Sequence, residues 1–408
     1  MDGWNGLPLI RVRNPCNLYH PRRPHRPRIN REEAIAMQFI DLKAQQSRIR
    51  DRIEANIRTV LDHGQYVMGP EIAELERRLA AAAGVRHATA CASGTDALLM
   101  ILMARGIGPG DAVFTTPFTF IATAEVIRLL GATPVFVDID PATFNIDPDR
   151  LDAAISGFDA KAAGLTPRAV IPVDLFGLPA DYDAVNAVAR KHKLFVLEDA
   201  AQSFGATYRG RKACALGDAA ATSFFPAKPL GGYGDGGMCF TDDDDMAEAL
   251  VSIRVHGMGA DKYDNIRIGI NGRMDTLQAA VLLAKFEIFP EELTRRRAVA
   301  DRYTEALEGV GVPRVPEDCR SAWAQYSILA ENAGHREAIQ DRLAAAGIPF
   351  AVYYPIPLHR QTAFRTLGYR EGDFPVTEDC AARILSLPMH PYLEPGDQER
   401  VIGGVNGG

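Results

Sequence analysis

The pattern of apolar and polar positions predicts a chain of alternating helices and strands that begins near residue 42. Apolar residues recur every three or four positions from Leu42 to His63, so we expect an amphipathic helix that ends at Gly64. Beyond it, short runs rich in apolar and β-branched residues alternate with helical runs. The expected strands are 87–92, 112–116, 133–138, 169–175 and 194–198. The expected helices between them are 95–104, 121–130, 149–155 and 181–192.

The expected strands are apolar throughout and do not alternate with polar residues. Such strands are buried on both faces, as in a largely parallel sheet that helices cover on both sides. The pattern continues with candidate strands and then with long helical runs, at 221–225, 237–240, 246–255 and from 274 to about 307. The last hundred residues mix candidate strands with a helix, at 323–329, 350–354 and 336–345.

This pattern predicts an α/β fold with two domains. We expect a large domain over residues 37–275, built on a mixed, mostly parallel sheet sandwiched by helices. A long connecting helix and a smaller C-terminal α+β domain follow over residues 276–408. No internal repeat interrupts residues 37–408.

Composition and charge exclude several classes of protein. Apolar residues make up 47% and charged residues 24% of the 408 residues, which is typical of a globular protein. The longest apolar run, 97–104, is far shorter than the roughly 18 residues that a membrane-spanning helix needs. A formal net charge of −7 gives no reason to expect nucleic acid as a partner. We therefore expect neither a membrane nor a nucleic acid as a binding partner.

The six cysteines show no CxxC spacing, and no histidine lies at the spacing of a zinc finger. We expect reduced, mostly structural thiols in a cytoplasmic protein, and no metal site. The cysteines are Cys16, Cys91, Cys214, Cys239, Cys319 and Cys380.

Residues 1–36 differ from the rest of the chain. They contain seven arginines, no lysine, three acidic residues and five prolines, whereas the remaining residues are strongly acidic. Such a segment cannot bury enough apolar surface to order itself, so we expect it to be disordered. It is either a binding arm or an over-long start with Met37 as the true initiator. The second interpretation is favoured because folded patterning begins abruptly at Phe39.

Polar residues follow two of the expected strands, where ligands of an α/β sheet bind. Ser93 to Asp96 follow the strand 87–92 and open a helix, so Gly94 and the free amides could bind a phosphate. The same residues could be a plain helix cap. Glu198 and Asp199 end the strand 194–198. Such a carboxylate either caps a helix or faces a cationic ligand.

Lys228 lies between two prolines beside a loop in which five of seven residues, 231–237, are glycine. Residues 232–237 match GxGxxG, but a strand follows them instead of a helix, so we reject a dinucleotide site. Surface lysines rarely lie in such apolar and conformationally restricted surroundings. Lys228 is therefore the leading candidate for a functional lysine.

Taken together, seven segments resemble the fold-type I pyridoxal-phosphate enzymes, and specifically the DegT/DnrJ/EryC1/StrS family of nucleotide-sugar aminotransferases. The resemblance covers residues 38–408, with the motifs in the family's order. Its anchors are the segments 69–71, 92–98, 198–202, 223–237, 271–275, 354–359 and 387–392.

The resemblance implies a role for each matching residue. Lys228 would hold pyridoxal 5'-phosphate covalently and move the proton between substrate and cofactor. Asp199 would keep the pyridine nitrogen protonated, because a buried carboxylate opposite it raises its pKa. The other cofactor contacts would come from Gly94, Thr95, Ser223, Gln202, Phe120 and Asn271.

Among these contacts, Gly94, Thr95 and Ser223 would bind the cofactor phosphate. Gln202 would contact the ring hydroxyl, and Phe120 would stack on the ring. In the family an asparagine of the neighbouring subunit completes the phosphate site, and Asn271 matches it. A homodimer with a shared active site would then be the smallest functional unit.

The resemblance further implies a two-stage transfer from an amino donor, expected to be L-glutamate, to a keto-sugar carried on a nucleotide. The similarity is densest to 3-aminotransferases that act on UDP-2-acetamido-2-deoxy-3-keto-D-glucuronate for bacterial surface polysaccharides. Arg273 would pair with the uronate, and Tyr354 would assist. Arg273 could instead form a structural salt bridge with Asp275.

One departure weakens the uronate assignment, because Tyr353 stands where that subgroup has histidine. A tyrosine donates a hydrogen bond but brings no positive charge. The alternative substrate is a dTDP-linked 3-keto-6-deoxyhexose, which lacks the carboxylate. His359 would contact the substrate in either case, unless it is a solvent-facing loop residue.

Two further classes carry the same fold. The family's sugar dehydratases have histidine in place of the lysine, so Lys228 argues against that activity. A non-catalytic, cofactor-binding regulator would need an added DNA-binding module, and 36 residues are too few for one.

Overall fold

The computed structural model describes residues 37–407, to which every structural statement below refers. The predictions made for residues 1–36, and for Cys16, lie outside the described residues. The expected first helix is confirmed as α1 (Leu42–His63), with Asp41 as its N-cap and Gly64 as its C-cap in the left-handed conformation. Glycine reaches that conformation without a steric penalty.

A seven-stranded sheet forms the centre of the fold, in the order β1-β9-β8-β5-β4-β2-β3. Six strands run parallel, and β9 is antiparallel to its neighbours β1 and β8. The expected mixed, mostly parallel sheet is therefore confirmed. Its strands are β1 (His87–Cys91), β2 (Asp111–Thr115), β3 (Thr133–Phe136), β4 (Thr166–Ile171), β5 (Phe195–Asp199), β8 (Ala219–Ser223) and β9 (Gly237–Thr241).

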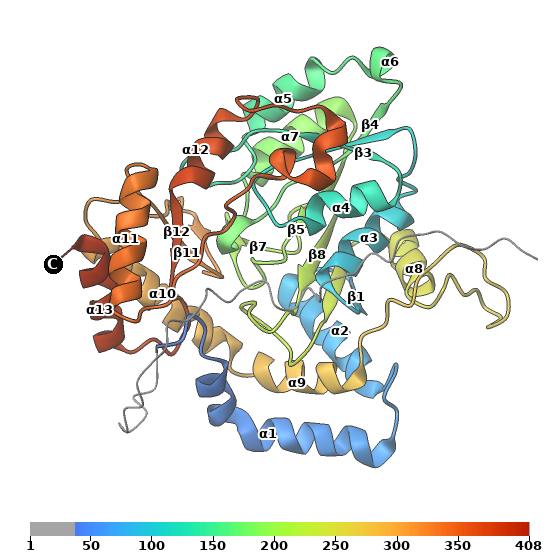
Figure 1. Cartoon of the computed structure of the whole chain (residues 1–408). Coiled ribbons are helices and arrows are strands. Elements are labelled where there is room, and N and C mark those ends of the chain that lie inside the picture. Colours follow the sequence, from blue (N-terminus) through green and yellow to red (C-terminus); the bar gives the residue numbers. More distant parts are fainter. Residues whose placement is uncertain (1–36, 408) are drawn as a thin grey trace, which may run out of the picture. The chain divides into compact units, whose positions relative to one another are not determined.

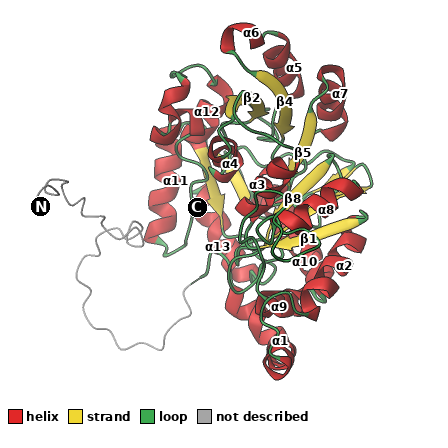
Figure 2. Ribbon diagram, turned by 90° about the vertical axis from the view of Figure 1, so that its right-hand side faces the viewer, coloured by secondary structure: helices red, strands yellow, loops and turns green. Residues whose placement is uncertain are grey.

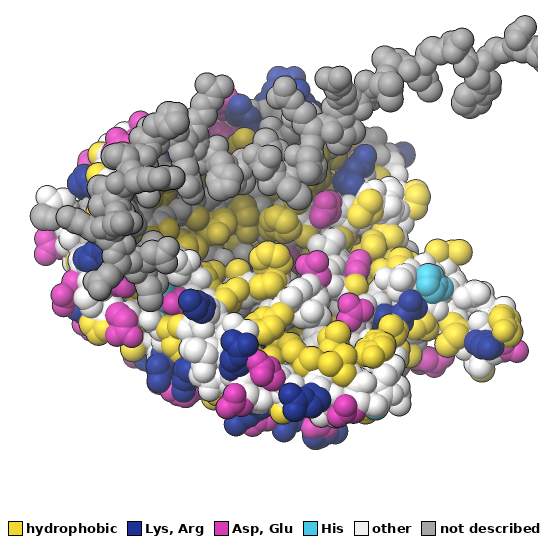
Figure 3. All heavy atoms as spheres, turned by 60° about the horizontal axis from the view of Figure 1, so that its bottom comes forward, with side chains coloured by type: hydrophobic (Ala, Val, Ile, Leu, Met, Phe, Trp, Pro, Cys, Tyr) yellow, Lys and Arg dark blue, Asp and Glu magenta, His cyan; other side chains and the backbone are white. Residues whose placement is uncertain are grey.

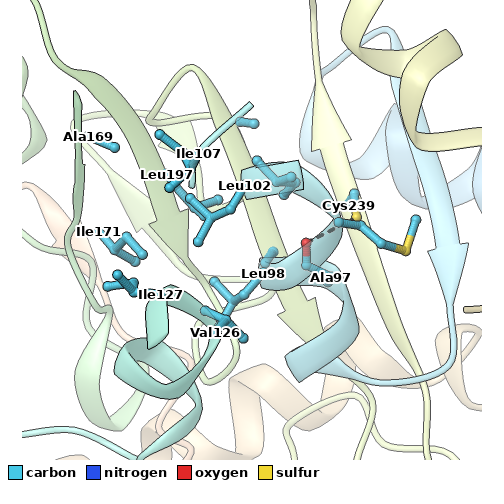
Figure 4. Close-up of a cluster of buried hydrophobic side chains, with 14 of the residues drawn as sticks. Ala97, Leu98, Leu102, Ile107, Val126, Ile127, Ala169, Ile171, Leu197 and Cys239 are labelled. Atoms are coloured by element: carbon cyan, nitrogen blue, oxygen red, sulfur yellow. Dashed lines mark hydrogen bonds between the residues drawn. The ribbon is translucent and has the colours of Figure 1, made fainter. Parts of the chain in front are cut away.

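Helices cover both faces of this sheet (Figures 1 and 2). One face packs against three helices: α3 (Gly94–Ala104), α4 (Ala122–Leu129) and α8 (Asp244–Ile253). Figure 4 shows Leu98, Leu102 and Val126 of these helices directed toward sheet residues. The other face packs against α2 (Pro70–Ala83), α5 (Pro148–Ser156), α7 (Tyr182–His192) and α9 (Thr276–Phe286). A short helix, α6 (Ala160–Ala163), precedes β4.

The C-terminal part packs around its own cluster of buried apolar residues. A two-stranded antiparallel sheet of β11 (Tyr326–Leu329) and β12 (Ile384–Leu387) lies among helices. Those helices are α10 (Phe289–Ala306), α11 (Ala333–Ala345), α12 (Pro375–Arg383) and α13 (Pro395–Asn406). The described residues 37–407 belong to one compact unit, so the boundary at residue 275 stays a prediction.

Short elements complete the fold. A small sheet has the order β10-β6-β7, with strands β10 (Cys319–Arg320), β6 (Thr207–Tyr208) and β7 (Arg211–Lys212). Three 3₁₀ helices are η2 (Leu175–Gly177), η3 (Leu358–Arg360) and η4 (Thr362–Leu367). The strand pattern did not indicate these pieces, because two or three residues carry no periodicity.

Two expected elements were wrong. The single helix from 274 to about 307 is two helices, α9 and α10, which are separated at Glu287 and Ile288. Pro290 sits in the first turn of α10, where its missing N–H needs no partner. The expected strand at 350–354 does not form, and only Ala351 makes an isolated bridge, to Ser386.

Candidate active site

The carboxyl edge of the sheet brings together residues from two strand ends, one loop and one helix N-terminus. Asp199 ends β5, Ser223 ends β8, and Lys228 lies in the loop between β8 and β9. Because β5 and β8 are parallel neighbours, with Asp199 opposite Ala221, their ends meet at the same edge. The N-terminus of α3 reaches this edge from β1. The structure therefore brings these candidate residues together at one edge of the sheet, and their roles stay predictions.

Lys228 is half-buried in a constrained loop. Its backbone N–H donates to the carbonyl of Phe225 at 2.8 Å, which closes a tight turn. Burial lowers the pKa of its ammonium group to about 8, against the opposing effect of the Asp199 charge. A lysine with this pKa is partly neutral near physiological pH, so it can act as a nucleophile or base.

Asp199 is buried and accepts hydrogen bonds on both carboxylate oxygens. The Thr123 hydroxyl donates to it at 2.7 Å, and the Ala201 N–H donates at 3.2 Å. Burial raises the pKa of Asp199, while these bonds and the Lys228 charge lower it. The charged form is thus held in an apolar environment, where its field is strong.

Sequence reasoning missed Thr123. This residue lies in the first turn of α4 and is 1% exposed, and its hydroxyl is 3.1 Å from that of Thr119. Two threonines one helical turn apart directly after a strand end were the available signal. Thr123 fixes the orientation of the Asp199 carboxylate.

Glu198, adjacent to Asp199, serves a different purpose. Its carboxylate accepts from the N–H groups of Cys214 at 2.6 Å and Leu216 at 2.9 Å. It is fully buried and does not cap a helix. Of the two carboxylates that end this strand, Asp199 faces the candidate site, and Glu198 supports the loop before β8.

Gly94 and Ser223 form a close contact at the N-terminus of α3. A Cβ atom on Gly94 would lie 2.7 Å from the Ser223 Cβ, so only glycine fits there. The Ser93 side chain caps the helix, accepting from the Asp96 N–H at 3.0 Å. The remaining first-turn amides, including that of Thr95, have no partner within a helix. Both interpretations of this segment are therefore compatible: Ser93 is a cap, and the adjoining amides with the Ser223 hydroxyl suit an anion.

Aromatic residues border the site. The Phe120 side chain is 55% exposed, and its ring lies 6.4 Å from that of Tyr354. The Tyr354 hydroxyl accepts a hydrogen bond from the Gln202 amide at 3.2 Å, and burial raises its pKa. The same Gln202 accepts from the Phe176 N–H at 2.6 Å. Gln202 thus ties Tyr354, from the C-terminal part, to the edge of the sheet.

Arg273 lines a cavity of about 480 Å³ that also includes Ser93, Asp96 and Gln278. Within residues 37–407, Arg273 forms no salt bridge, so the alternative pairing with Asp275 is not observed. Asn271 is exposed on the preceding segment. Tyr353 packs beside Tyr354, with ring centroids 5.8 Å apart.

His359 is not a solvent-facing loop residue. It is 2% exposed, its Nε2 lies 2.8 Å from the Glu378 carboxylate, and its ring packs on Phe374 at 4.7 Å. Its neighbour Leu358 donates to the Pro117 carbonyl, which anchors this segment to the loop that carries Phe120. That histidine orders the edge of the site, and its contact with substrate stays a prediction.

No group of three or more His, Cys, Asp or Glu side chains within residues 37–407 could hold a metal ion. Among the described helices, none combines the length and apolar character needed to cross a membrane.

A sheet of this topology, with a lysine after β8 and a buried carboxylate ending β5, defines a fold-type I aminotransferase. The chain belongs to the DegT/DnrJ/EryC1/StrS aminotransferase family, which matches residues 47–406. It is thus an aminotransferase of the sugar-modifying kind, as the sequence motifs indicated.

Three relatives illustrate the range of this family. The chain is 51% identical to UDP-2-acetamido-2-deoxy-3-oxo-D-glucuronate aminotransferase of Pseudomonas aeruginosa, over 88% of this chain and 96% of the relative. It is 42% identical to a pleiotropic regulatory protein of Geobacillus stearothermophilus, over 89% and 96%. It is 38% identical to dTDP-3-amino-3,4,6-trideoxy-alpha-D-glucose transaminase of Streptomyces venezuelae, over 92% and 97%.

Solved structures agree with this assignment. A DegT/DnrJ/EryC1/StrS aminotransferase from Brucella abortus is 53% identical, with a TM-score of 0.88 and coverage of 91% of this chain and 99% of that one. NtdA from Bacillus subtilis, solved with bound cofactor PMP, is 30% identical, with a TM-score of 0.80 and coverage of 90% and 82%.

Proposed function

We propose that this chain transfers an amino group from L-glutamate to the keto carbon of UDP-2-acetamido-2-deoxy-3-keto-D-glucuronate, for surface polysaccharide synthesis. The observation that carries the chemistry is the pairing of a half-buried Lys228 with a buried Asp199 at one sheet edge. The similarity to the Pseudomonas aeruginosa relative, over nearly the whole of both chains, supports the substrate.

The site fits pyridoxal 5'-phosphate as cofactor. Gly94 leaves room where a Cβ would collide with Ser223, and the amides at this helix N-terminus suit an anion. Phe120 offers an exposed aromatic face, and Asp199 offers a buried negative charge opposite a lysine. When bound, pyridoxal phosphate supplies an electron sink for the bonds broken next to the amine.

Lys228 performs the proton transfer. Its amine, with a pKa of about 8, would take the proton from the substrate carbon and deliver it to the C4′ carbon of the bound cofactor, and would act in the reverse direction in the other half of the transfer. Asp199 stays charged because Thr123 and the Ala201 amide hydrogen bond to the carboxylate form. Gln202 and Tyr354 close the side of the site toward the C-terminal part.

Arg273 provides the cation for the uronate. Its guanidinium lines the cavity beside the N-terminus of α3 without a carboxylate partner among the described residues. A planar guanidinium binds a carboxylate through two parallel hydrogen bonds. Tyr353 and Tyr354, which pack together near Phe120, are further candidate hydrogen-bond donors to the sugar.

Replacement of Arg273 by leucine tests this assignment. We expect kcat/KM for the UDP-linked keto-uronate to fall about a hundredfold, because a charge-assisted pair of bonds is lost. For a dTDP-linked 3-keto-6-deoxyhexose the value should change less than about threefold, because no carboxylate is present. Steady-state kinetics with both sugars would check this prediction.

Equal losses with both sugars would contradict the assignment and mark Arg273 as structural. A wild-type preference for the neutral dTDP-sugar would favour the alternative substrate. Tyr353 in place of histidine and the similarity to the Streptomyces venezuelae transaminase support that alternative. Absence of transamination with every sugar and donor would instead favour a regulatory role like that named for the Geobacillus relative.

We further propose a homodimer in which each site uses Asn271 of the neighbouring subunit. Figure 3 shows hydrophobic side chains in a band across the face that carries α1. Large exposed apolar residues include Tyr66, Val67 and Met68, and Val67 bridges to Asp275 beside Arg273. An exposed apolar band next to the site supports burial against a second copy.

Mixing two inactive variants tests the shared site. Lys228→Ala and Asn271→Ala homodimers each lack a required group in every site. A heterodimer contains one intact site, so random exchange should restore about a quarter of wild-type activity. If subunits exchange between the two variants but the mixture is no more active than the average of the two separate homodimers, each site belongs to one chain.

We place the protein in the cytoplasm. The five described cysteines, Cys91, Cys214, Cys239, Cys319 and Cys380, are all buried and form no disulfide, as a reducing compartment would leave them. Cytoplasmic sugar nucleotides would be available there.

A further inference from the structure

Helix α9 presents two polar side chains toward the glycine-rich loop Gly231–Gly237. Gln278 and Lys285 are seven residues apart, which is two helical turns, so they lie on the same face of α9. Their neighbours on this helix include the buried apolar residues Ala279 and Leu282. Figure 1 shows α9 between α1 and the sheet. The presence of two polar residues on a helix with mostly buried apolar neighbours therefore calls for a structural explanation.

Lys285 is fully buried and is held by the backbone of the loop. Its ammonium group donates to the Gly231 carbonyl at 2.7 Å and lies 3.5 Å from that of Gly232. The same nitrogen lies 4.3 Å from the centre of the Tyr233 ring, which is a cation–π contact. Within residues 37–407 it forms no salt bridge with a carboxylate.

Gln278 contacts the next residues of the same loop. Its side-chain oxygen accepts from the Tyr233 N–H at 2.8 Å. A Cβ on Gly234 would lie 2.8 Å from its side-chain nitrogen, so the loop backbone packs directly on the amide. Together the two side chains of α9 hold consecutive residues, 231–234.

A buried ammonium group destabilises the folded protein, because its charge loses the favourable interaction with water. Burial lowers the pKa of Lys285 to about 8, so the charged form of this lysine is destabilised by its surroundings. An apolar residue of similar volume would pack there without this cost. The contacts of the lysine therefore serve the loop and not the stability of the helix alone.

The held loop is the one that carries Lys228. The Gly232 N–H donates to the Phe224 carbonyl, and the Phe224 N–H donates to that of Gly236, both at 2.8 Å. These bonds close residues 224–236 into a compact loop. Because Lys228 lies inside it, a shift of the glycine segment displaces the lysine backbone.

We infer that Lys285 and Gln278 are positioning residues that fix the loop 224–236 and thereby place the Lys228 amine against Asp199. Neither side chain touches the reacting atoms; Gln278 also lines the cavity beside Arg273, whereas Lys285 does not. This inference rests on the proposed role of Lys228, and no feature of the sequence motifs pointed to it.

The test uses the full-length holoenzyme with Lys285→Met, which keeps the volume and removes the donors. We expect kcat to fall about tenfold to a hundredfold, because a shift of about 1 Å at a catalytic group has that effect. The KM for the keto-sugar should stay within about twofold. Hydrogen exchange of the amides in 224–236, followed by mass spectrometry, should accelerate about tenfold.

Leu282→Met, on the same helix, is the control for altered packing and should leave kcat and loop exchange unchanged. Wild-type kcat and wild-type loop exchange in a folded Lys285→Met protein would overturn the inference. If that protein does not fold, loop exchange in Gln278→Leu protein decides the question; its kinetics do not, because Gln278 also lines the Arg273 cavity. If Lys285→Met speeds loop exchange but the wild-type protein transaminates no substrate, the result would count against the proposed function alone.

Discussion

The Lys228→Ala protein is expected to lose transaminase activity by a factor of about a thousand or more. Lys228 is the lysine at the carboxyl edge of the sheet with a lowered pKa, about 8, and with Asp199 as its charge partner. Alanine removes both the group that holds the cofactor and the group that moves the proton. General acid–base catalysis by a positioned side chain alone accounts for about 10²–10⁴ in rate.

The measurement is single-turnover transamination together with the visible spectrum of the cofactor. Wild-type protein should show an absorbance that borohydride removes, and Lys228→Ala protein should lack that reducible species. Lys212→Ala, an exposed lysine on β7, is the matched control and should behave as wild type. A Lys228→Ala protein that transaminates at the wild-type rate would defeat the assignment.

Asp199→Asn should have the second largest effect, a fall in kcat of about a hundredfold or more. Asparagine keeps the size and can still accept from Thr123, but it carries no charge. The buried charge acts in a region of low dielectric, where one preorganised electrostatic interaction contributes about 10²–10³ in rate. We expect the protein to remain folded, because burial disfavours the charged carboxylate, as its raised pKa shows, and asparagine removes that charge without changing the size of the side chain.

Glu198→Gln is the matched comparison, since it neutralises the adjacent buried carboxylate. That side chain accepts from Cys214 and Leu216, so a glutamine would leave one N–H facing an amide nitrogen. We expect a loss of about 1–3 kcal/mol in the free energy of unfolding, with kcat nearly unchanged. Thermal unfolding and steady-state kinetics separate the two variants. Equal losses of kcat in both would contradict the distinct role of Asp199.

Much of the fold could be predicted because its strands are uniformly apolar. Such runs locate β1, β2, β3, β5, β8 and β9 within a few residues, and polar residues after them mark the site edge. Lys228 stood out because it combines flanking prolines with a glycine loop. The order of the sheet strands, by contrast, has no signature in the pattern.

The rest depends on tertiary contacts. A local pattern could not show that Thr123 donates to Asp199, or that Lys285 donates to Gly231, because these pairs are far apart in the sequence. The sequence left open whether His359 contacts the substrate or faces solvent, and its burial against Phe374 and Glu378 excludes only the second alternative. The break between α9 and α10 was hidden because apolar spacing continues across Glu287 and Ile288.

Charge was a misleading guide in one respect. The net charge of the whole chain is −7, yet the proposed cofactor and substrate are both anionic. We therefore expect the attraction to be local, from the amides at the N-terminus of α3 and from Arg273. This is consistent with a site built from backbone donors and one guanidinium.

The most direct test of the account follows a labelled amino group through the wild-type enzyme. Protein loaded with pyridoxal phosphate is incubated with ¹⁵N-labelled L-glutamate and UDP-2-acetamido-2-deoxy-3-keto-D-glucuronate, and the sugar nucleotide is analysed by mass spectrometry. We expect a ¹⁵N-amino sugar at carbon 3 and formation of 2-oxoglutarate, with neither product from Lys228→Ala protein. Release of 2-oxoglutarate without label in this sugar would contradict the proposed substrate, and label transfer by Lys228→Ala protein would contradict the mechanism.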